Sequence, residues 1–97
     1  MDLNKFAKEV HENAISKGWW EKAVSFPETI ALCHSELSEA LECYRNNQIE
    51  EIPVELADCI IRILDYYAFA GIDIEDAIKR KHEHNKTRPY RHGNKLC

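Results

Sequence analysis

Apolar residues recur every three or four positions along four segments of the chain, and short polar stretches separate these segments. This spacing is typical of amphipathic α-helices. The first segment covers residues 3–17, and Gly18 is expected to end it. Its apolar stripe consists of Phe6, Val10, Ala14 and Ile15. Strand-like alternation occurs nowhere in the sequence, so the pattern predicts an all-α protein.

The second segment has a well-marked start and runs to about Arg45. Ser25 stands at the N-cap position, Pro27 falls in the first turn, and Glu28 completes a capping box. Residues 46–48, which are Asn-Asn-Gln, interrupt the pattern. The apolar positions expected to face inward are Ile30, Cys33, Leu37, Ala40, Leu41 and Tyr44.

The third segment begins near Pro53 and continues to Ala70, where Gly71 provides a C-terminal stop. Asp73 is expected to cap the fourth segment, which fades over residues 85–87. The inward positions of the third segment are Leu56, Ile60, Ile63, Leu64 and Tyr67. We therefore predict a four-helix bundle with short loops.

The length of 97 residues predicts a single domain over 1–97, with an irregular basic tail at 87–97. A chain this short buries only about 60–65% of its unfolded surface, so its own core is thin and association is expected. No apolar run approaches the roughly 20 residues of a membrane span. The polar start resembles no signal peptide, so a cytoplasmic location without a membrane partner is expected.

The four cysteines are Cys33, Cys43, Cys59 and Cys97, and no two of them form a C-x-x-C pair. Three of them fall within the helical patterns. Buried free thiols are therefore a better interpretation than disulfides or a zinc site.

The net charge of −4 conceals an asymmetry. Residues 1–78 hold 16 Asp and Glu against six Lys and Arg, whereas residues 79–97 hold seven Lys and Arg against Glu83 alone. An acidic body with a basic end can bind a metal and an anion side by side. The acidic body argues against a nucleic-acid partner, because it would repel a phosphate backbone on most approaches.

Two acidic pairs lie on consecutive helical segments, Glu36-x-x-Glu39 and Glu55-x-x-Asp58. A spacing of three places both members of each pair on one side of a helix. If the two helices pack antiparallel, four carboxylates converge and favour a hard cation such as Mg²⁺ or Mn²⁺. The polar stripe of the third segment also includes Arg62 and Asp65. A solvated acidic face remains the alternative, and spacing alone does not decide between the two.

The basic end offers candidate phosphate ligands. Lys81 and Asn85 are four residues apart and share a helix face, although ordinary surface residues have the same spacing. The following segment suggests an anion clamp, or alternatively a disordered basic tail, and its candidate residues are Arg88, Tyr90, Arg91 and Lys95. His82 and His84 do not form a recognised zinc motif.

Trp19 and Trp20 lie at the junction between the first two segments. Two tryptophans in a thin-cored domain usually close the core or a subunit interface. The alternative is that Trp20 provides a stacking surface for a nucleobase.

The two acidic pairs, with 15 residues between Glu39 and Glu55, resemble the motif of the MazG-like nucleoside triphosphate pyrophosphohydrolases. The similarity continues through the glycine turn at Gly71, the K-x-x-x-N segment of Lys81 and Asn85, and the ending R-P-Y-R-H-G-N-K, and it covers roughly residues 25–95. That ending resembles one small single-domain subgroup. Many members have two adjacent glutamates at the start of the first motif, whereas this chain has Ser35 before Glu36. The number of bound metal ions is therefore open.

The resemblance implies an all-α, MazG-like bundle that hydrolyses a (deoxy)nucleoside triphosphate to the monophosphate and pyrophosphate. It implies that Mg²⁺ binds Glu36, Glu39, Glu55 and Asp58, with Glu39 as general base. Lys81, with Arg88 or Arg91, would stabilise the departing pyrophosphate. A homodimer or homotetramer is expected. The alternative is a non-catalytic helical interaction module with the same fold. The base and sugar of the substrate are not specified by the residues.

Overall fold

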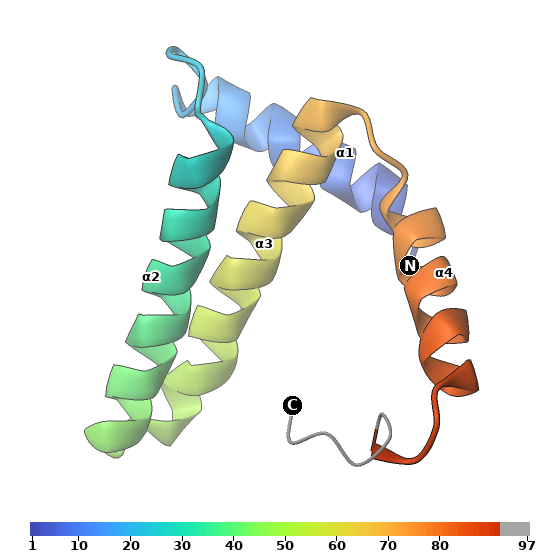
Figure 1. Cartoon of the computed structure of the whole chain (residues 1–97). Helices are drawn as coiled ribbons and strands as arrows, with labels where there is room; N and C mark the ends of the chain where they lie inside the picture. The colour runs from blue at the N-terminus through green and yellow to red at the C-terminus, as the bar shows by residue number, and fades with distance from the viewer. Residues whose placement is uncertain (92–97) are drawn as a thin grey trace.

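The structure is a computed structural model that describes residues 1–91. Within these residues there is no strand, so the predicted all-α class is confirmed. None of the described helices combines the length and the apolar character that a membrane span requires. The elements are α1 (Leu3–Ser16), α2 (Phe26–Arg45), the 3-10 turn η1 (Ile49–Glu51), α3 (Ile52–Ala70) and α4 (Ile74–Thr87) (Figure 1).

The helix ends follow the capping signals in the sequence. The Ser25 side chain accepts a hydrogen bond from the Glu28 backbone N–H, and Asp73 does the same for Asp76. Gly71 ends α3 in the left-handed conformation, with φ at 68°, which a residue with a side chain adopts at a cost. Only η1 was not predicted, because three residues are too few to show a periodicity.

The two longest helices, α2 and α3, form an antiparallel pair, and α1 crosses one side of α3 (Figure 1). Small side chains fill the seam of the pair. The small buried residues there are Thr29, Cys33, Ala40, Cys43 and Cys59. A second cluster joins α1, α3 and the start of α4 through Ala7, Leu64 and Ile74.

Three of the four cysteines are buried free thiols, as predicted, and Cys97 lies outside the described residues. Burial raises the pKa of the Cys33 and Cys43 thiols. These side chains therefore stay protonated at neutral pH and act as small apolar residues rather than as nucleophiles.

Many of the positions expected to face inward are exposed, which corrects that part of the prediction. Their exposed fractions are 39–67%, and they are Ile15, Ile30, Leu37, Leu41, Tyr44, Leu56, Ile60 and Ile63. The reason is geometric, because α1 covers one side of α3 and none of the helices within residues 1–91 lies against the other face of the α2–α3 pair (Figure 1).

The N-terminal ends of α1 and α4 cap each other. The Leu3 backbone N–H donates to Glu75 Oε1 at 2.8 Å, and the Ile74 backbone N–H donates to Asn4 Oδ1 at 3.0 Å. Asn4 Nδ2 also donates to Asp73 Oδ1 at 2.8 Å. The start of α4 is thereby attached to α1, and the remainder of α4 leads away from α2 and α3 (Figure 1).

We expect Asn4→Ala to loosen this attachment, because it removes both the acceptor for Ile74 N–H and the donor to Asp73. Loss of such a cap costs about 0.5–2 kcal/mol. Thermal unfolding by circular dichroism should show a Tm lower by about 4–8 °C per kcal/mol lost in a domain of this size. Lys8→Ala, at an exposed position of the same helix, is the control. An Asn4→Ala Tm equal to that of the control would contradict the capping account.

Candidate metal centre

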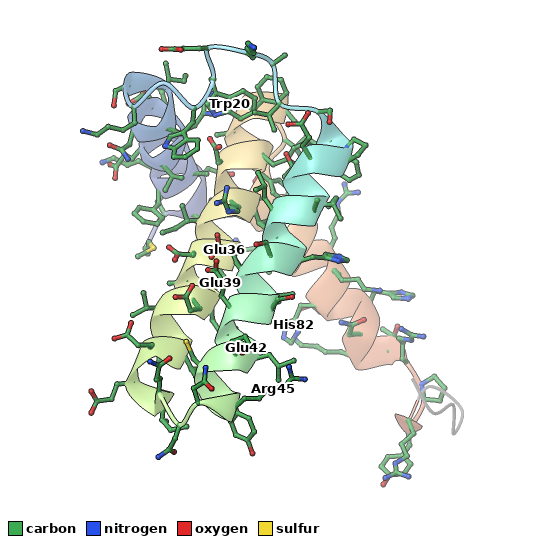
Figure 2. All side chains as sticks on the ribbon, turned by 90° about the vertical axis from the view of Figure 1, so that its left-hand side faces the viewer. Trp20, Glu36, Glu39, Glu42, Arg45 and His82 are labelled. Atoms are coloured by element: carbon green, nitrogen blue, oxygen red, sulfur yellow. The ribbon has the colours of Figure 1, made fainter. Side chains whose placement is uncertain are left out.

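Three carboxylates converge at the seam between α2 and α3. One oxygen from each of Glu36, Glu39 and Glu55 lies within 4.8 Å of the others. Glu36 and Glu39 are three residues apart on α2, so both point to the same side of that helix (Figure 2). Glu55 belongs to the first turn of α3, and the antiparallel pairing brings it opposite them.

Two oxygens of this cluster are buried without a hydrogen-bond partner, Glu36 Oε2 and Glu55 Oε2. Glu36 as a residue is only 7% exposed, whereas Glu39 is open to solvent. A buried carboxylate oxygen without a partner is costly, and a cation between the three groups would remove that cost. Carboxylate oxygens are the ligands that Mg²⁺ and Mn²⁺ prefer, so the donor set fits such an ion.

The electrostatics of Glu55 reflect this crowding. A hydrogen bond to Glu39, together with burial and the negative charges of Glu39, Asp58 and Glu36, raises the pKa of the Glu55 carboxyl above its ordinary value. When no cation is bound, the neighbouring negative charges therefore disfavour the ionised form of Glu55.

Asp58, the fourth predicted ligand, lies at the edge of this group. It is exposed, and its charge acts on Glu55, but it is not among the three residues whose oxygens converge. The structure thus brings together three of the four predicted carboxylates and leaves the fourth beside them.

Arg62 was not predicted to be part of the site. Its Nε donates to Glu36 Oε1 at 3.0 Å, across the seam from α3 to α2. The signal in the sequence was the presence of one cation in the polar stripe of α3, one turn after Asp58. Spacing alone did not show that this cation would meet a residue of the other helix.

A cavity of about 540 Å³ opens beside the cluster, between α1, α2, α3 and the α1–α2 loop. Ligand pockets in proteins are commonly about 300–1,000 Å³. Its polar lining residues are Glu9, Asn13, Thr29, Glu36, Asp58, Arg62 and Asp65. The rest of its lining is mostly apolar or aromatic and includes Trp19, Trp20, Leu32, Ile61 and Tyr66. The cavity therefore joins a carboxylate cluster to an aromatic region.

A polar and aromatic network fixes Trp20 at this cavity (Figure 2). The Trp20 Nε1–H points at both carboxylate oxygens of Asp65, at 3.2 and 3.1 Å, and its ring stacks on Phe69 with centroids 4.4 Å apart. His11 Nδ1 lies 2.6 Å from Asp65 Oδ1 and so joins α1 to α3. The sequence pattern indicated Trp20 but not His11 or Phe69, because these residues meet only through the crossing of α1 over α3. Trp19, by contrast, is 70% exposed.

Among residues 1–91, the structure does not bring the predicted phosphate ligands to the cluster within one chain. Lys81 and Asn85 are exposed on the part of α4 that leads away from α2 and α3 (Figure 1). The other described candidates come directly after α4 and are exposed as well. The Arg91 guanidinium lies 5.9 Å from the centre of the Tyr90 ring. These candidates are Arg88, Tyr90 and Arg91, whereas Lys95 lies outside the described residues.

Comparison of the chain with known protein families, curated proteins and solved structures finds no match.

We expect Glu55→Gln to raise the Tm of the metal-free protein at neutral pH. The folded-state pKa of Glu55 lies above its ordinary value of 4.5, so ionisation at higher pH lowers the stability of the fold. The Tm advantage of the variant in EDTA should therefore be largest above the folded-state pKa. It should shrink as the pH falls through the folded-state pKa and vanish well below 4.5, where the carboxyl is protonated in both the folded and the unfolded state.

Glu12→Gln is the matched control, because it makes the same chemical change at an exposed position of α1. Its Tm difference from the parent chain should vary little with pH. A Glu55→Gln protein that melts below the parent at pH 7.5 would show that the Glu55 charge stabilises the metal-free fold, contrary to this account.

Proposed function

We propose that this chain is a Mg²⁺-dependent hydrolase of (deoxy)nucleoside triphosphates that releases the monophosphate and pyrophosphate. One observation carries the proposal. The two buried and unpartnered carboxylate oxygens of Glu36 and Glu55 lie at a cluster beside a cavity that Trp20 lines. A ligand that suits both parts has an aromatic ring at one end and a metal-bound anion at the other. The motif resemblance to MazG-like enzymes points to the same ligand class.

In this proposal Glu36, Glu39 and Glu55 would hold the ion, with one oxygen of Glu39 left free of it, and Asp58 would contribute from the edge of the cluster. Mn²⁺ would fit the same oxygen ligands. When bound, the metal offsets the charge of the triphosphate and lowers the pKa of a water molecule. The cation would also offset the repulsion between the Glu39 and Glu55 carboxylates, and this would strengthen its binding.

Glu39 is our candidate for the general base, because it is the exposed member of the cluster and so is accessible to water. It accepts the proton of the attacking water while the oxygen of that water forms a bond to the α-phosphorus. The bond from the α-phosphorus to the oxygen bridging the α- and β-phosphates breaks, and pyrophosphate leaves with the electron pair. The proton then passes from Glu39 to solvent.

Trp20 is our candidate for the nucleobase platform. Asp65 and Phe69 already fix the position of the indole, so stacking a base on it would cost little side-chain entropy. The nucleotide pool of the cytoplasm would supply the substrate.

The phosphate ligands are proposed to come from a second copy in a homodimer or homotetramer. The exposed apolar positions of α2 and α3 provide a face for association, and residues 79–91 form a basic arm opposite in charge to the acidic body. Lys81 and Asn85 of one copy would then reach the carboxylate cluster of another. Arg88, Tyr90, Arg91 and Lys95 would follow them toward the pyrophosphate.

A helical interaction module is the second candidate, and the exposed apolar face of α2 and α3 favours it. A module of this kind needs that face but gains nothing from two unpartnered buried carboxylate oxygens. Such groups lower stability, so their presence favours the enzyme.

We expect purified protein to release pyrophosphate from at least one nucleotide in a panel of canonical and modified NTPs and dNTPs with Mg²⁺, and to lose this activity in EDTA. Glu39→Gln should lower kcat by about 10²–10⁴, the usual contribution of a general base. Glu42→Gln is the matched control, three residues along the same helix and exposed (Figure 2). It should leave kcat nearly unchanged.

Two results would contradict this proposal. Orthophosphate as the primary product would place the protein in another class of phosphohydrolase. Absence of turnover across the whole panel, with a folded protein and saturating Mg²⁺, would favour the interaction module.

We expect Lys81→Ala and Glu55→Gln to complement each other if the site is shared between copies. Lys81→Ala alone should lower kcat/KM by one to three orders of magnitude, or roughly 1.4–4 kcal/mol. In a mixture of the two inactive variants, subunit exchange should form sites with both functional residues and restore part of the activity. Light scattering should give a dimer or tetramer. A fully active monomer, or mixed dimers without restored activity, would show that Lys81 acts within its own chain or not at all.

A further inference from the structure

Arg62 is the one cation that touches the carboxylate cluster among the described residues of α2 and α3. These two helices contain only two Lys or Arg residues, Arg45 and Arg62. Arg45 pairs with Glu42 at the exposed surface, where the two side chains are 63% and 59% exposed. Arg62 instead pairs with Glu36, whose side chain is only 10% exposed.

The ion pair between Arg62 and Glu36 gives a hydrogen-bond partner to only one of the two oxygens of the Glu36 carboxylate. Arg62 Nε donates to Glu36 Oε1 at 3.0 Å, while Glu36 Oε2 remains buried without a partner. A buried carboxylate needs a nearby positive charge to stay ionised. Arg62 supplies a positive charge beside Glu36 when no metal is bound, but it leaves Glu36 Oε2 without a hydrogen-bond partner.

The same guanidinium opposes a metal ion. A divalent cation beside Glu36 would stand close to Arg62, and like charges at such separations repel even after partial screening by solvent. The Arg62 side chain is 35% exposed and lines the cavity, so open space lies beside it.

We propose that Arg62 is an internal competitor for the metal, which neutralises Glu36 in the metal-free protein and weakens cation binding at the cluster. This inference rests on the metal site of the proposed function and adds a positioning residue to it. Arg62 stabilises the fold without metal, and it sets the metal affinity lower than the three carboxylates alone would give.

The test is to titrate four full-length proteins with Mn²⁺ and to determine the Mn²⁺ Kd of each. Electron paramagnetic resonance reports the concentration of the free ion during the titration. The four proteins are the parent chain, Arg62→Met, Arg62→Lys and Arg45→Met. Arg45→Met is the matched control, because it makes the same charge change beside an exposed glutamate (Figure 2). Removing the competing charge should tighten the Mn²⁺ Kd of Arg62→Met by about tenfold or more, or about 1.4 kcal/mol. Arg45→Met should change it by less than about twofold.

Arg62→Lys separates charge from hydrogen-bond geometry. Lysine keeps the positive charge, so its Kd should stay closer to that of the parent chain than to that of Arg62→Met. The metal-free Tm of Arg62→Met should fall by about 5–10 °C, because Glu36 loses its partner, and saturating Mn²⁺ should close most of that gap. A residue with a purely structural role would lower the Tm without tightening the Kd.

The outcomes that overturn the inference are distinct from failure of the proposed function. If Arg62→Met binds Mn²⁺ no more tightly than the parent chain does, the proposed role of Arg62 is overturned. The metal site is left intact by that result. Equal tightening in Arg45→Met, or in Arg62→Lys, overturns the local charge competition. No Mn²⁺ binding to either the parent chain or Arg62→Met at millimolar concentration overturns the metal site itself, and the competitor with it.

Discussion

The close approach of α2 to α3 is the constraint on which the rest of the structure depends. Small buried side chains line the seam, including Cys33, Ala40, Cys43 and Cys59. Packed helices lie about 8–10 Å apart, and small residues at the contact favour the shorter distances. This closeness places the carboxylates of two helices within 4.8 Å of one another. A larger side chain in the seam would separate the helices and disperse the cluster.

The crowded carboxylates then account for the unusual electrostatics of the site. Arg62 compensates one oxygen of Glu36, the pKa of Glu55 rises beside Glu39, and two oxygens stay buried without a partner. In our proposal this arrangement is incomplete until a cation binds. The fold is incomplete in a second sense, because apolar positions of α2 and α3 are exposed and α4 leads away from the pair. Association of two chains would supply both a cover for that face and the cations of α4.

Local signals in the sequence predicted the helices well, and they predicted the site in part. Ser25, Gly71 and Asp73 act through their immediate neighbours, so the ends of α2, α3 and α4 could be predicted. The convergence of Glu36 and Glu55 also followed, because it needs only two antiparallel helices. The Arg62 pair depends on which residues face each other across the seam, and periodicity does not specify that register. The exposed stripes were predicted to be buried, since a pattern shows that a face is apolar without showing what covers it.

The most direct test of this account is the anomalous scattering of Mn²⁺ in crystals of the full-length protein grown with millimolar Mn²⁺. The account predicts a strong peak at ligand distance from oxygens of Glu36, Glu39 and Glu55, roughly 2.0–2.3 Å away. It further predicts that the guanidinium of Arg62 lies farther from Glu36 than 3.0 Å once the ion is bound. A structure with no peak between these carboxylates, or with Mn²⁺ bound only at His82 or His84, would contradict the claim that the α2–α3 seam is a metal centre.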